Sequence, residues 1–370
     1  MTWASWVTEE NALIGASGRW RSIRELHARG LTGTLDDGRE VVSFASNDYL
    51  GLSSHPAVVA TAHAALETWG AGMGSARLIA GARPVHRELE DELARWKNET
   101  AALLFPTGYA ANLGVLTTFG ARGATIFSDE LNHASIVDGC RLARADVRVY
   151  RHADVEHLRL LLNAVDRAVV VTDAVFSMDG DLAPLDELAA VCRESRALLV
   201  VDEAHAVLGP HADLEDTEHL RVGTLSKFLG SSGGFVSGPG EFIDLLVNRA
   251  RPFIFTTAST PADAAAARAA VQVFRSAEGN ALRARLRDLI DRVAPRHPSP
   301  IIPIVLGDEG VAMAAAAALL DRGLLVPAIR PPSVPPGTSR LRVTLSAAHT
   351  DEQIETLLGA LHELGVMADA

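Results

Sequence analysis

The middle of the chain alternates between short apolar runs and amphipathic stretches. The apolar runs predict buried strands at 101–105, 125–128, 147–150, 168–172, 198–201 and 221–225. Between these runs, apolar residues recur every three or four positions, and one such stretch predicts a helix over 86–98. Strands that alternate with helices favour a mostly parallel sheet with both faces covered. Ligands bind such sheets beyond the carboxyl ends of the strands, and polar residues follow several of the predicted strands.

The two ends of the chain have other patterns. Spaced apolar residues over 13–30 predict one or two amphipathic helices, and 34–44 predicts a hairpin that turns at Asp37-Gly38. In the last third, helices are predicted over 261–274, 280–294 and 312–320, and strands over 301–306, 325–329 and 341–345. We therefore expect a doubly wound α/β fold divided into an N-terminal arm at 1–44, a large domain at 45–272 and a small α+β domain at 273–370.

Composition argues against several classes of protein. The net charge of −12 disfavours a nucleic-acid surface, because phosphate backbones need clustered Lys and Arg. The apolar stretches are short or interrupted by charge, so we expect no membrane span, and the first residues lack the features of a signal peptide. Cys140 and Cys192 have no metal-ligand spacing, which indicates reduced thiols in a cytoplasmic protein without a metal site.

Two predicted strand ends carry residues suited to one cofactor. Asp202 follows a buried strand, His205 comes one turn later, and Lys227 follows the next buried strand. Pyridoxal phosphate needs an amine for its aldehyde and an anion against its pyridine nitrogen, and Lys227 and Asp202 supply these two groups. Taken singly, an acidic strand-end cap and a surface lysine would explain both residues, and their spacing is only moderately specific.

Longer motifs surround these residues, at 47–52, 106–112, 132–135, 175–181 and 328–342. Through them the chain resembles, nearly end to end, the α-oxoamine synthase family of fold-type-I pyridoxal-phosphate enzymes. The resemblance implies an aminotransferase-like fold and pyridoxal 5'-phosphate held as a Schiff base on Lys227. The family also forms homodimers with the active site at the subunit interface, so a homodimer is expected.

The resemblance assigns roles residue by residue. It implies that Lys227, His133 and Asp202 are catalytic, and it places these cofactor contacts: Gly108, Tyr109, His133, Ser177, Asp202, His205, Thr224, Lys227, Thr256 and Thr257. The amides of Gly108 and Tyr109 would face the phosphate, and Thr256 and Thr257 would reach the phosphate of the partner subunit. Considered without the family, most of these positions suit ordinary turn, core or loop residues equally well.

Substrate residues follow from the same resemblance. Arg342 matches the arginine that binds the amino-acid carboxylate, whereas Arg340 is taken as a surface salt-bridge residue. Arg21 matches an arginine near the substrate, although Arg19 and Arg24 are close alternatives. Segment 328–342 is most similar to the family members that condense L-alanine with a pimeloyl thioester, on coenzyme A or acyl carrier protein, in biotin synthesis.

The sequence also departs from the family pattern. Asp173-Ala174 stands where Glu-Gly is usual, and Glu203 and Ala206 replace an aspartate and a glycine, which could reshape the pocket wall. Two alternatives stay open. One is a sister synthase that uses glycine or serine, such as 5-aminolevulinate synthase or glycine C-acetyltransferase; the other is a non-catalytic partner subunit, a type that lacks the lysine.

Overall fold

The apolar runs in the middle of the chain assemble into one sheet. The computed structural model describes all residues except 122, 164, 211, 215 and 367–370. The strands are β4 (Ala101–Phe105), β5 (Thr125–Asp129), β6 (Asp146–Tyr150), β7 (Ala168–Asp173), β8 (Leu198–Asp202), β9 (His219–Thr224) and β10 (Gly234–Gly238). Their order is β4-β10-β9-β8-β7-β5-β6, and only β10 runs against its neighbours. The fold class and all six predicted strands are confirmed, whereas β10 was missed because its glycines hide the strand pattern.

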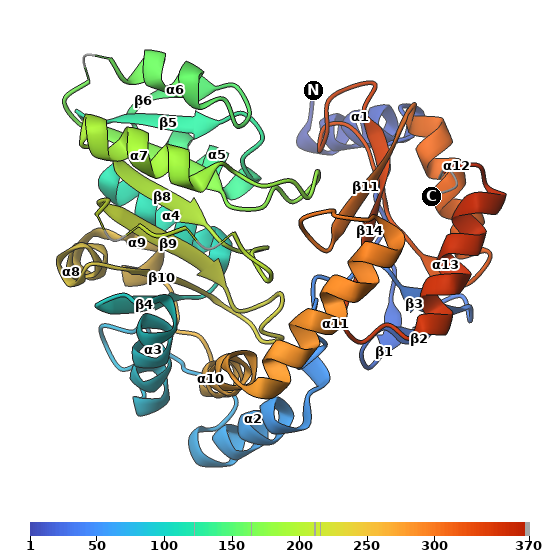
Figure 1. Ribbon diagram of the computed structural model, residues 1–370, viewed down its shortest axis with the longest axis horizontal. Coiled ribbons are helices and arrows are strands. Elements are labelled where there is room, and N and C mark those ends of the chain that lie inside the picture. Colours follow the sequence, from blue (N-terminus) through green and yellow to red (C-terminus); the bar gives the residue numbers. More distant parts are fainter. Residues whose placement is uncertain (122, 164, 211, 215, 367–370) are drawn as a thin grey trace.

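Both faces of this sheet are buried, which explains its continuous apolar strands. In β8, Leu198 and Val200 pack into one apolar cluster and Leu199 and Val201 into another, because successive side chains point to opposite faces. The covering helices lie on both sides (Figure 1): α3 (Pro84–Lys97), α4 (Gly108–Phe119), α5 (Ala134–Ala143), α6 (Val155–Leu162), α7 (Leu185–Ser195), α8 (Gly240–Arg249) and α9 (Arg251–Ile254). We call this sheet with its helices the large lobe.

The small lobe contains two further sheets. An antiparallel sheet is formed by β11 (Ile301–Gly307), β14 (Ser339–Thr344) and β13 (Ala328–Ile329), and a second by β1 (Leu26–Ala28), β2 (Thr32–Leu35), β3 (Glu40–Ser43) and β12 (Leu324–Leu325). Helices α12 (Glu309–Leu320) and α13 (Asp351–Glu363) accompany them. The predicted hairpin is confirmed. The strand predicted over 325–329 is instead split, because β12 pairs with β3 whereas β13 pairs with β14.

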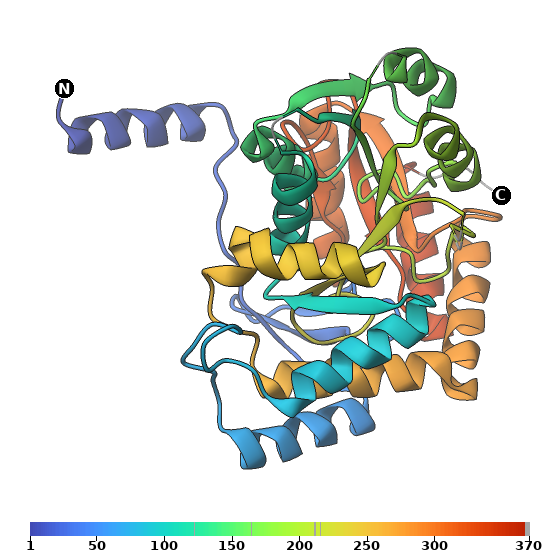
Figure 2. The same ribbon diagram turned by 90° about the vertical axis from the view of Figure 1, so that its left-hand side faces the viewer.

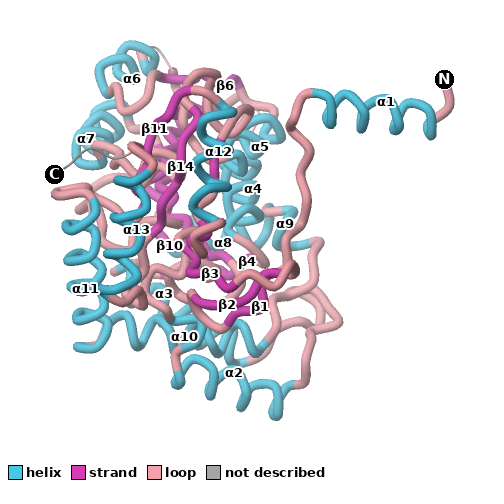
Figure 3. The backbone as a smooth tube through the Cα atoms, turned by 90° about the vertical axis from the view of Figure 1, so that its right-hand side faces the viewer, coloured by secondary structure: helices cyan, strands magenta, loops and turns pink. Residues whose placement is uncertain are grey.

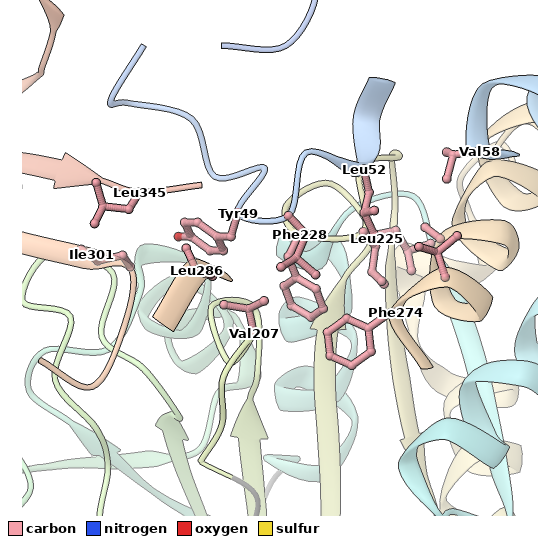
Figure 4. Close-up of a cluster of buried hydrophobic side chains, with 14 of the residues drawn as sticks. Tyr49, Leu52, Val58, Val207, Leu225, Phe228, Phe274, Leu286, Ile301 and Leu345 are labelled. Carbon is pink, nitrogen blue, oxygen red and sulfur yellow. The ribbon is translucent and has the colours of Figure 1, made fainter. Parts of the chain in front are cut away.

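One apolar core runs from lobe to lobe. It includes residues of α2 (Pro56–Trp69), α10 (Pro261–Arg275) and α11 (Ala277–Val293), and the short helix η1 (Leu52–Ser54) adds Leu52. Figure 4 shows Tyr49 within this core, between Leu345 and Ile301 of the small lobe and Phe228 of the large lobe. The core therefore fixes how the carboxyl ends of the large sheet face the small lobe.

The N-terminal segment differs from the prediction. Helix α1 (Trp3–Ala16) begins well before residue 13, and residues 17–25 form no helix, so the helices predicted over 13–30 are wrong beyond residue 16. Thr2 caps α1, and none of its residues is buried. Figures 2 and 3 show α1 extending away from the rest of the chain. Within the described residues, no helix has the length and apolar character needed to cross a membrane. The predicted domain boundaries stay predictions.

Candidate active site

A cavity of about 250 Å³ lies at the carboxyl ends of the large sheet's strands. We call it the cofactor cavity. Its lining comes from strand ends and helix starts: Thr107, Gly108, Tyr109, Asn112, His133, Ser135, Asp173, Ser177, Asp202, Ala204, His205, Thr224, Ser226 and Lys227. Eight of the twelve site residues predicted from the sequence thus line one cavity, from segments more than a hundred residues apart, and a ninth, Arg342, lies beside its opening.

Lys227 is the amine of this cavity. The chain has only two lysines, and the other, Lys97, forms an ion pair with Glu203 at 2.6 Å outside the cavity. Burial lowers the pKa of Lys227, against the opposing effect of the Asp202 and Asp173 carboxylates. A buried amine with a lowered pKa has a larger neutral, nucleophilic fraction. Lys227 is therefore suited to bond covalently to a carbonyl group.

Asp202 is held by two donors. Asn112 Nδ2 donates to its Oδ2 at 2.6 Å, and the backbone N–H of Ala204 donates to its Oδ1 at 2.9 Å. Asn112 Nδ2 also contacts Ser135 Oγ at 2.9 Å, which fixes the amide. Asp202 is 5 % exposed and lines the cavity, so it presents a fixed anion to whatever occupies it.

His133 caps helix α5 at the cavity wall. Its backbone N–H donates to Asp173 Oδ2 at 2.8 Å, and its Nδ1 lies 2.8 Å from Ser135 Oγ. Burial lowers the pKa of the His133 ring, with Asp202 opposing and Lys227 adding to the shift. Burial, and next the neighbouring Asp202, raise the pKa of Asp173 well above its usual range. Asp173, which stands where the family pattern has glutamate, thus anchors the backbone of His133 at the cavity wall.

The other end of the cavity suits an anion. Thr107 caps α4, whose first residues, Gly108 and Tyr109, line the cavity. A Cβ on Gly108 would lie 3.2 Å from Thr224 Cβ, so glycine permits this close approach. The hydroxyls of Thr224 and Ser226 lie 2.8 Å apart beside it. A helix N-terminus with adjacent hydroxyls is an ordinary way to hold a phosphate. The Tyr109 side chain points elsewhere, to Asp138.

His205 is fixed between the lobes. Its Nδ1 shares a 2.6 Å hydrogen bond with the Tyr49 hydroxyl, which also donates to Asn47 Oδ1 at 3.0 Å. Burial, and next the nearby Lys227 and Arg342 cations, lower the pKa of His205 well below its usual value. The His205 ring is therefore neutral at pH 7 and can exchange a hydrogen bond with a ligand oxygen without adding charge.

Arg342 reaches the cavity rim from the small lobe. This arginine of β14 is 6 % exposed, and its Nε donates to the Ser177 carbonyl at 2.5 Å. Its Nη2 donates to Asn47 Oδ1 at 3.3 Å. Because Ser177 lines the cavity, the guanidinium lies beside the opening, where it could bind a carboxylate.

The cavity fits pyridoxal phosphate. Asp202 would offer a carboxylate to the pyridine nitrogen, Lys227 an amine to the aldehyde, and the start of α4 its N–H groups to the phosphate. A side chain at residue 108 would fill the space between α4 and Thr224. Because Gly108 has none, a phosphate could approach the backbone N–H groups there. The residues present therefore match the group at both of its ends.

Three predicted residues lie outside the cofactor cavity. Thr256 is half-buried and Thr257 exposed, and Thr257 forms a β-bridge with Ala76. Arg21 is exposed and lines a separate cavity of about 600 Å³, which we call the arm cavity. The arm cavity is lined by Ile14, Arg19, Trp20, Arg21, Met313 and residues 328–333.

Sequence reasoning missed several residues of the site. Asn112 and Ser135 belong to the motifs at 106–112 and 132–135. Asn112 contacts Asp202 and Ser135, and these hydrogen bonds form only because α4 packs against α5 and the end of β8. Asn112 follows Gly108 by four residues, a spacing that could have indicated one helix face. Ala206, a suspected change in the pocket wall, instead packs in an apolar cluster and is not among the lining residues.

Comparisons with known proteins agree with this site. Residues 39–361 match the family model of class I and II aminotransferases. The chain is 48% identical to an 8-amino-7-oxononanoate synthase of Anaeromyxobacter dehalogenans over 96% of this chain and 94% of the relative. It is 44% identical to another from Paraburkholderia xenovorans over 94% and 97%, respectively.

Solved structures give the same fold. A serine palmitoyltransferase from S. paucimobilis, with pyridoxal phosphate and myriocin bound, is 31% identical with a TM-score of 0.89, and 98% of each chain is covered. An 8-amino-7-oxononanoate synthase from Francisella tularensis is 27% identical with a TM-score of 0.73, over 87% of this chain and 97% of that one.

Proposed function

The chain belongs to the class I and II aminotransferase family, and we propose that it condenses L-alanine with a pimeloyl thioester to give 8-amino-7-oxononanoate, with release of carbon dioxide. The observation that carries this proposal is the 44–48% identity to synthases of that name over nearly the whole chain. The cofactor cavity supports it, because a buried lysine and a fixed carboxylate lie together there.

The cofactor is pyridoxal phosphate, which supplies an electron sink for the carbon next to an amino group. In the proposed arrangement, Lys227 bonds to its aldehyde and Asp202 contacts its ring nitrogen. Gly108, Tyr109 and Thr224 hold the phosphate. His133 would pack against the cofactor ring, and Ser177 and His205 would offer hydrogen bonds to the oxygen on that ring.

The chain's own groups then move the protons. The Lys227 amine, when it is free, would be placed to take the proton from alanine Cα. That carbon forms a bond to the thioester carbonyl and the carbon–sulfur bond breaks, with His133 placed to donate to the carbonyl oxygen. The Cα–carboxylate bond breaks next and releases carbon dioxide. Lys227 returns a proton to Cα.

Arg342 is proposed to bind the alanine carboxylate. Its planar fork matches a carboxylate, and its two contacts, to Ser177 and Asn47, aim it at the cavity rim. The same charge contributes to the lowered pKa of His205 and of Lys227, which supports its placement beside the site.

The arm cavity is proposed to receive the acyl donor. Its apolar walls, from Trp20, Ile329 and Pro331, suit the methylene chain of a pimeloyl group. Arg19 is paired with Glu309 at 2.7 Å, and Arg330 donates to the Gly18 carbonyl at 2.6 Å. Arg21 is thus the best candidate to bind the terminal carboxylate.

We also propose a cytoplasmic homodimer. Thr256 and Thr257 do not reach the cofactor cavity of their own chain, which is consistent with a contribution to the phosphate site of a partner. Light scattering should give a dimer, and a fully active monomer would contradict this arrangement. The buried, unpaired Cys140 and Cys192 suit a reducing compartment.

One alternative has structural support. The likeness to serine palmitoyltransferases, at TM-scores up to 0.89, favours a serine and long-chain acyl donor. Identity to those proteins is only 30–32%, against 44–48% for the synthases. A non-catalytic subunit is disfavoured because Lys227 is present and buried in the cavity.

A panel of donors and amino acids tests the proposal. Purified protein with added cofactor is assayed with pimeloyl, acetyl and palmitoyl thioesters against alanine, glycine and serine. Pimeloyl and alanine should give the highest specificity constants, although a methyl group is worth only about 1–3 kcal/mol, so some glycine turnover is expected. A higher specificity constant for palmitoyl with serine, or for acetyl with glycine, would overturn the proposal.

A further inference from the structure

The loop 176–181 of the large lobe lies directly against β14 of the small lobe. Arg342 donates to the Ser177 carbonyl, and Arg340, two residues earlier on the same face of the strand, contacts the next two residues of the loop. Arg340 Nη1 donates to the Met178 carbonyl at 3.3 Å and forms an ion pair with Asp179. Both arginines of β14 therefore bind one loop of the other lobe.

Arg340 is not a surface residue. It is 4 % exposed, whereas Asp179 keeps 34 % of its side chain exposed. A buried guanidinium without a carboxylate is strongly unfavourable, so this pair holds the loop and the strand in one relative position. The salt bridge expected for Arg340 is confirmed, whereas the surface position expected for it is wrong.

Gly180 brings the loop close to the small lobe. Its φ of +71° lies in the left-handed region, and a Cβ there would be 2.0 Å from the Ile301 carbonyl oxygen. The backbones of the two lobes thus pack without an intervening side chain at this point. The contact places the loop directly against the start of β11, the strand that pairs with β14.

His152 fixes the other end of the loop to the large sheet. Its Nε2 lies 2.6 Å from Asp181 Oδ2, and its Nδ1 lies 3.0 Å from Asp129 Oδ1 at the end of β5. The His152 ring also meets Phe176 edge-on, with centroids 4.4 Å apart. The Asp129 and Asp181 hydrogen bonds raise the pKa of His152 to about 10, so the ring is a cation at neutral pH.

We propose that Arg340 and Asp179 form a latch between the lobes that positions Arg342 for the carboxylate of the amino-acid substrate. The loop, anchored by His152, is the fixed side of the latch, and β14 is the side that carries Arg342. Arg340 is thus a positioning residue, which acts through its neighbour and does not contact the substrate. The inference rests on the proposed role of Arg342 in the condensation.

Binding of two amines separates this role from general structural damage. L-Alanine and ethylamine, which lacks only the carboxylate, are titrated against the holoenzyme while the visible absorbance of the cofactor is followed. Arg340→Met and Asp179→Asn should each weaken alanine binding about tenfold and leave ethylamine binding unchanged. A change of about tenfold is the size expected when energetic coupling through packed elements is lost. Arg340→Lys should recover part of the loss, because it keeps the charge opposite Asp179. Arg287→Met, which removes an exposed ion pair with Asp291 on α11, is the matched control and should change neither affinity.

Each outcome decides between the latch and its alternatives. An alanine-to-ethylamine ratio that is unchanged in Asp179→Asn overturns the latch, even if Arg340→Met does not fold. Equal losses for both amines also overturn it, because they indicate general damage. Arg342→Ala serves as the reference: if it too leaves the ratio unchanged, the assignment of Arg342 within the proposed function fails, and not the latch alone.

Discussion

The cofactor cavity and the arm cavity are built in opposite ways. The first is formed by strand ends and helix starts of one sheet; its carboxylate, Asp202, is buried and held by two donors, and the Lys227 amine lines the same cavity. The second lies between an exposed N-terminal segment and a proline-rich loop, and Arg21, which has no ion pair with any residue that the structure describes, is exposed. Buried, fixed groups are suited to carry the chemistry, and an adaptable exposed wall is suited to select the donor.

This contrast predicts different kinds of failure. Changes in the cofactor cavity should abolish turnover for every substrate, because all donors share the same reaction at alanine Cα. Changes in the arm cavity should alter the preference among donors and leave the cofactor unaffected. A cofactor-cavity substitution that changed only the donor preference, or an arm-cavity substitution that removed the cofactor, would contradict this distinction.

The largest effect is expected from Lys227→Ala. The variant should lose the borohydride-reducible chromophore and about a thousandfold or more of turnover, because covalent attachment and proton transfer both depend on this amine. Mass spectrometry of the reduced wild type should find the pyridoxyl group on Lys227 and not on Lys97, the chain's second lysine. A reducible chromophore and turnover in the variant would disprove the assignment.

Asp202→Asn should have the next largest effect. A neutral amide cannot keep the pyridine nitrogen protonated, and loss of a charge-assisted pair of about 1.5–3 kcal/mol slows turnover roughly tenfold to a hundredfold. The cofactor should remain partly bound, as measured by its absorbance. Asp146→Asn, at the exposed start of β6, is the control. Near-normal turnover of the Asp202 variant with alanine would exclude the electron-sink role.

Arg21→Ala should change selectivity more than rate. The specificity constant for a pimeloyl thioester should fall about threefold to tenfold relative to an uncharged acyl thioester of equal length, because an exposed ion pair contributes about 1 kcal/mol. Arg24→Ala, a nearby exposed arginine outside the arm cavity lining, should leave this ratio unchanged. Equal losses for both donors would argue against a carboxylate contact at Arg21.

His152→Gln should have the smallest effect, on stability, on the order of 1 kcal/mol. The folded pKa of His152, about 10, lies above the ordinary value of 6.5, so its stabilisation is full below pH 6.5 and is lost as the pH rises through about 10. Denaturant unfolding of wild type and variant should therefore differ most at pH 6 and least near pH 10.5. A difference that grows with pH would contradict this sign.

The sequence predicted the strands best where both faces are buried. Runs such as the one that became β8 are apolar without interruption, so the pattern and the structure agree. Strand β10 was missed because Gly234 and Gly238 have no side chains to show alternation, although Phe235 packs over Gly223 of β9. The helix α1 was misplaced because all its residues are exposed, so no core selects its apolar positions.

The site could be predicted only in part for a similar reason. Residues at strand ends, such as Asp202, follow directly from the order of elements along the chain. Hydrogen bonds between segments do not: Asn112 to Asp202, Asp173 to His133 and Asp179 to Arg340 all depend on how helices and lobes pack. The spacing of these residues along the chain does not predict that their side chains meet.

The central claim is a decarboxylative condensation and not the amino transfer after which the family is named. The most direct test incubates the holoenzyme with L-alanine labelled in its carboxyl carbon and a pimeloyl thioester, and measures labelled carbon dioxide, free thiol and aminoketone together. The proposed function predicts one labelled carbon dioxide for each thiol and each aminoketone formed, and little release without the thioester. Label retained in the organic product, or pyruvate formed in place of the aminoketone, would contradict it.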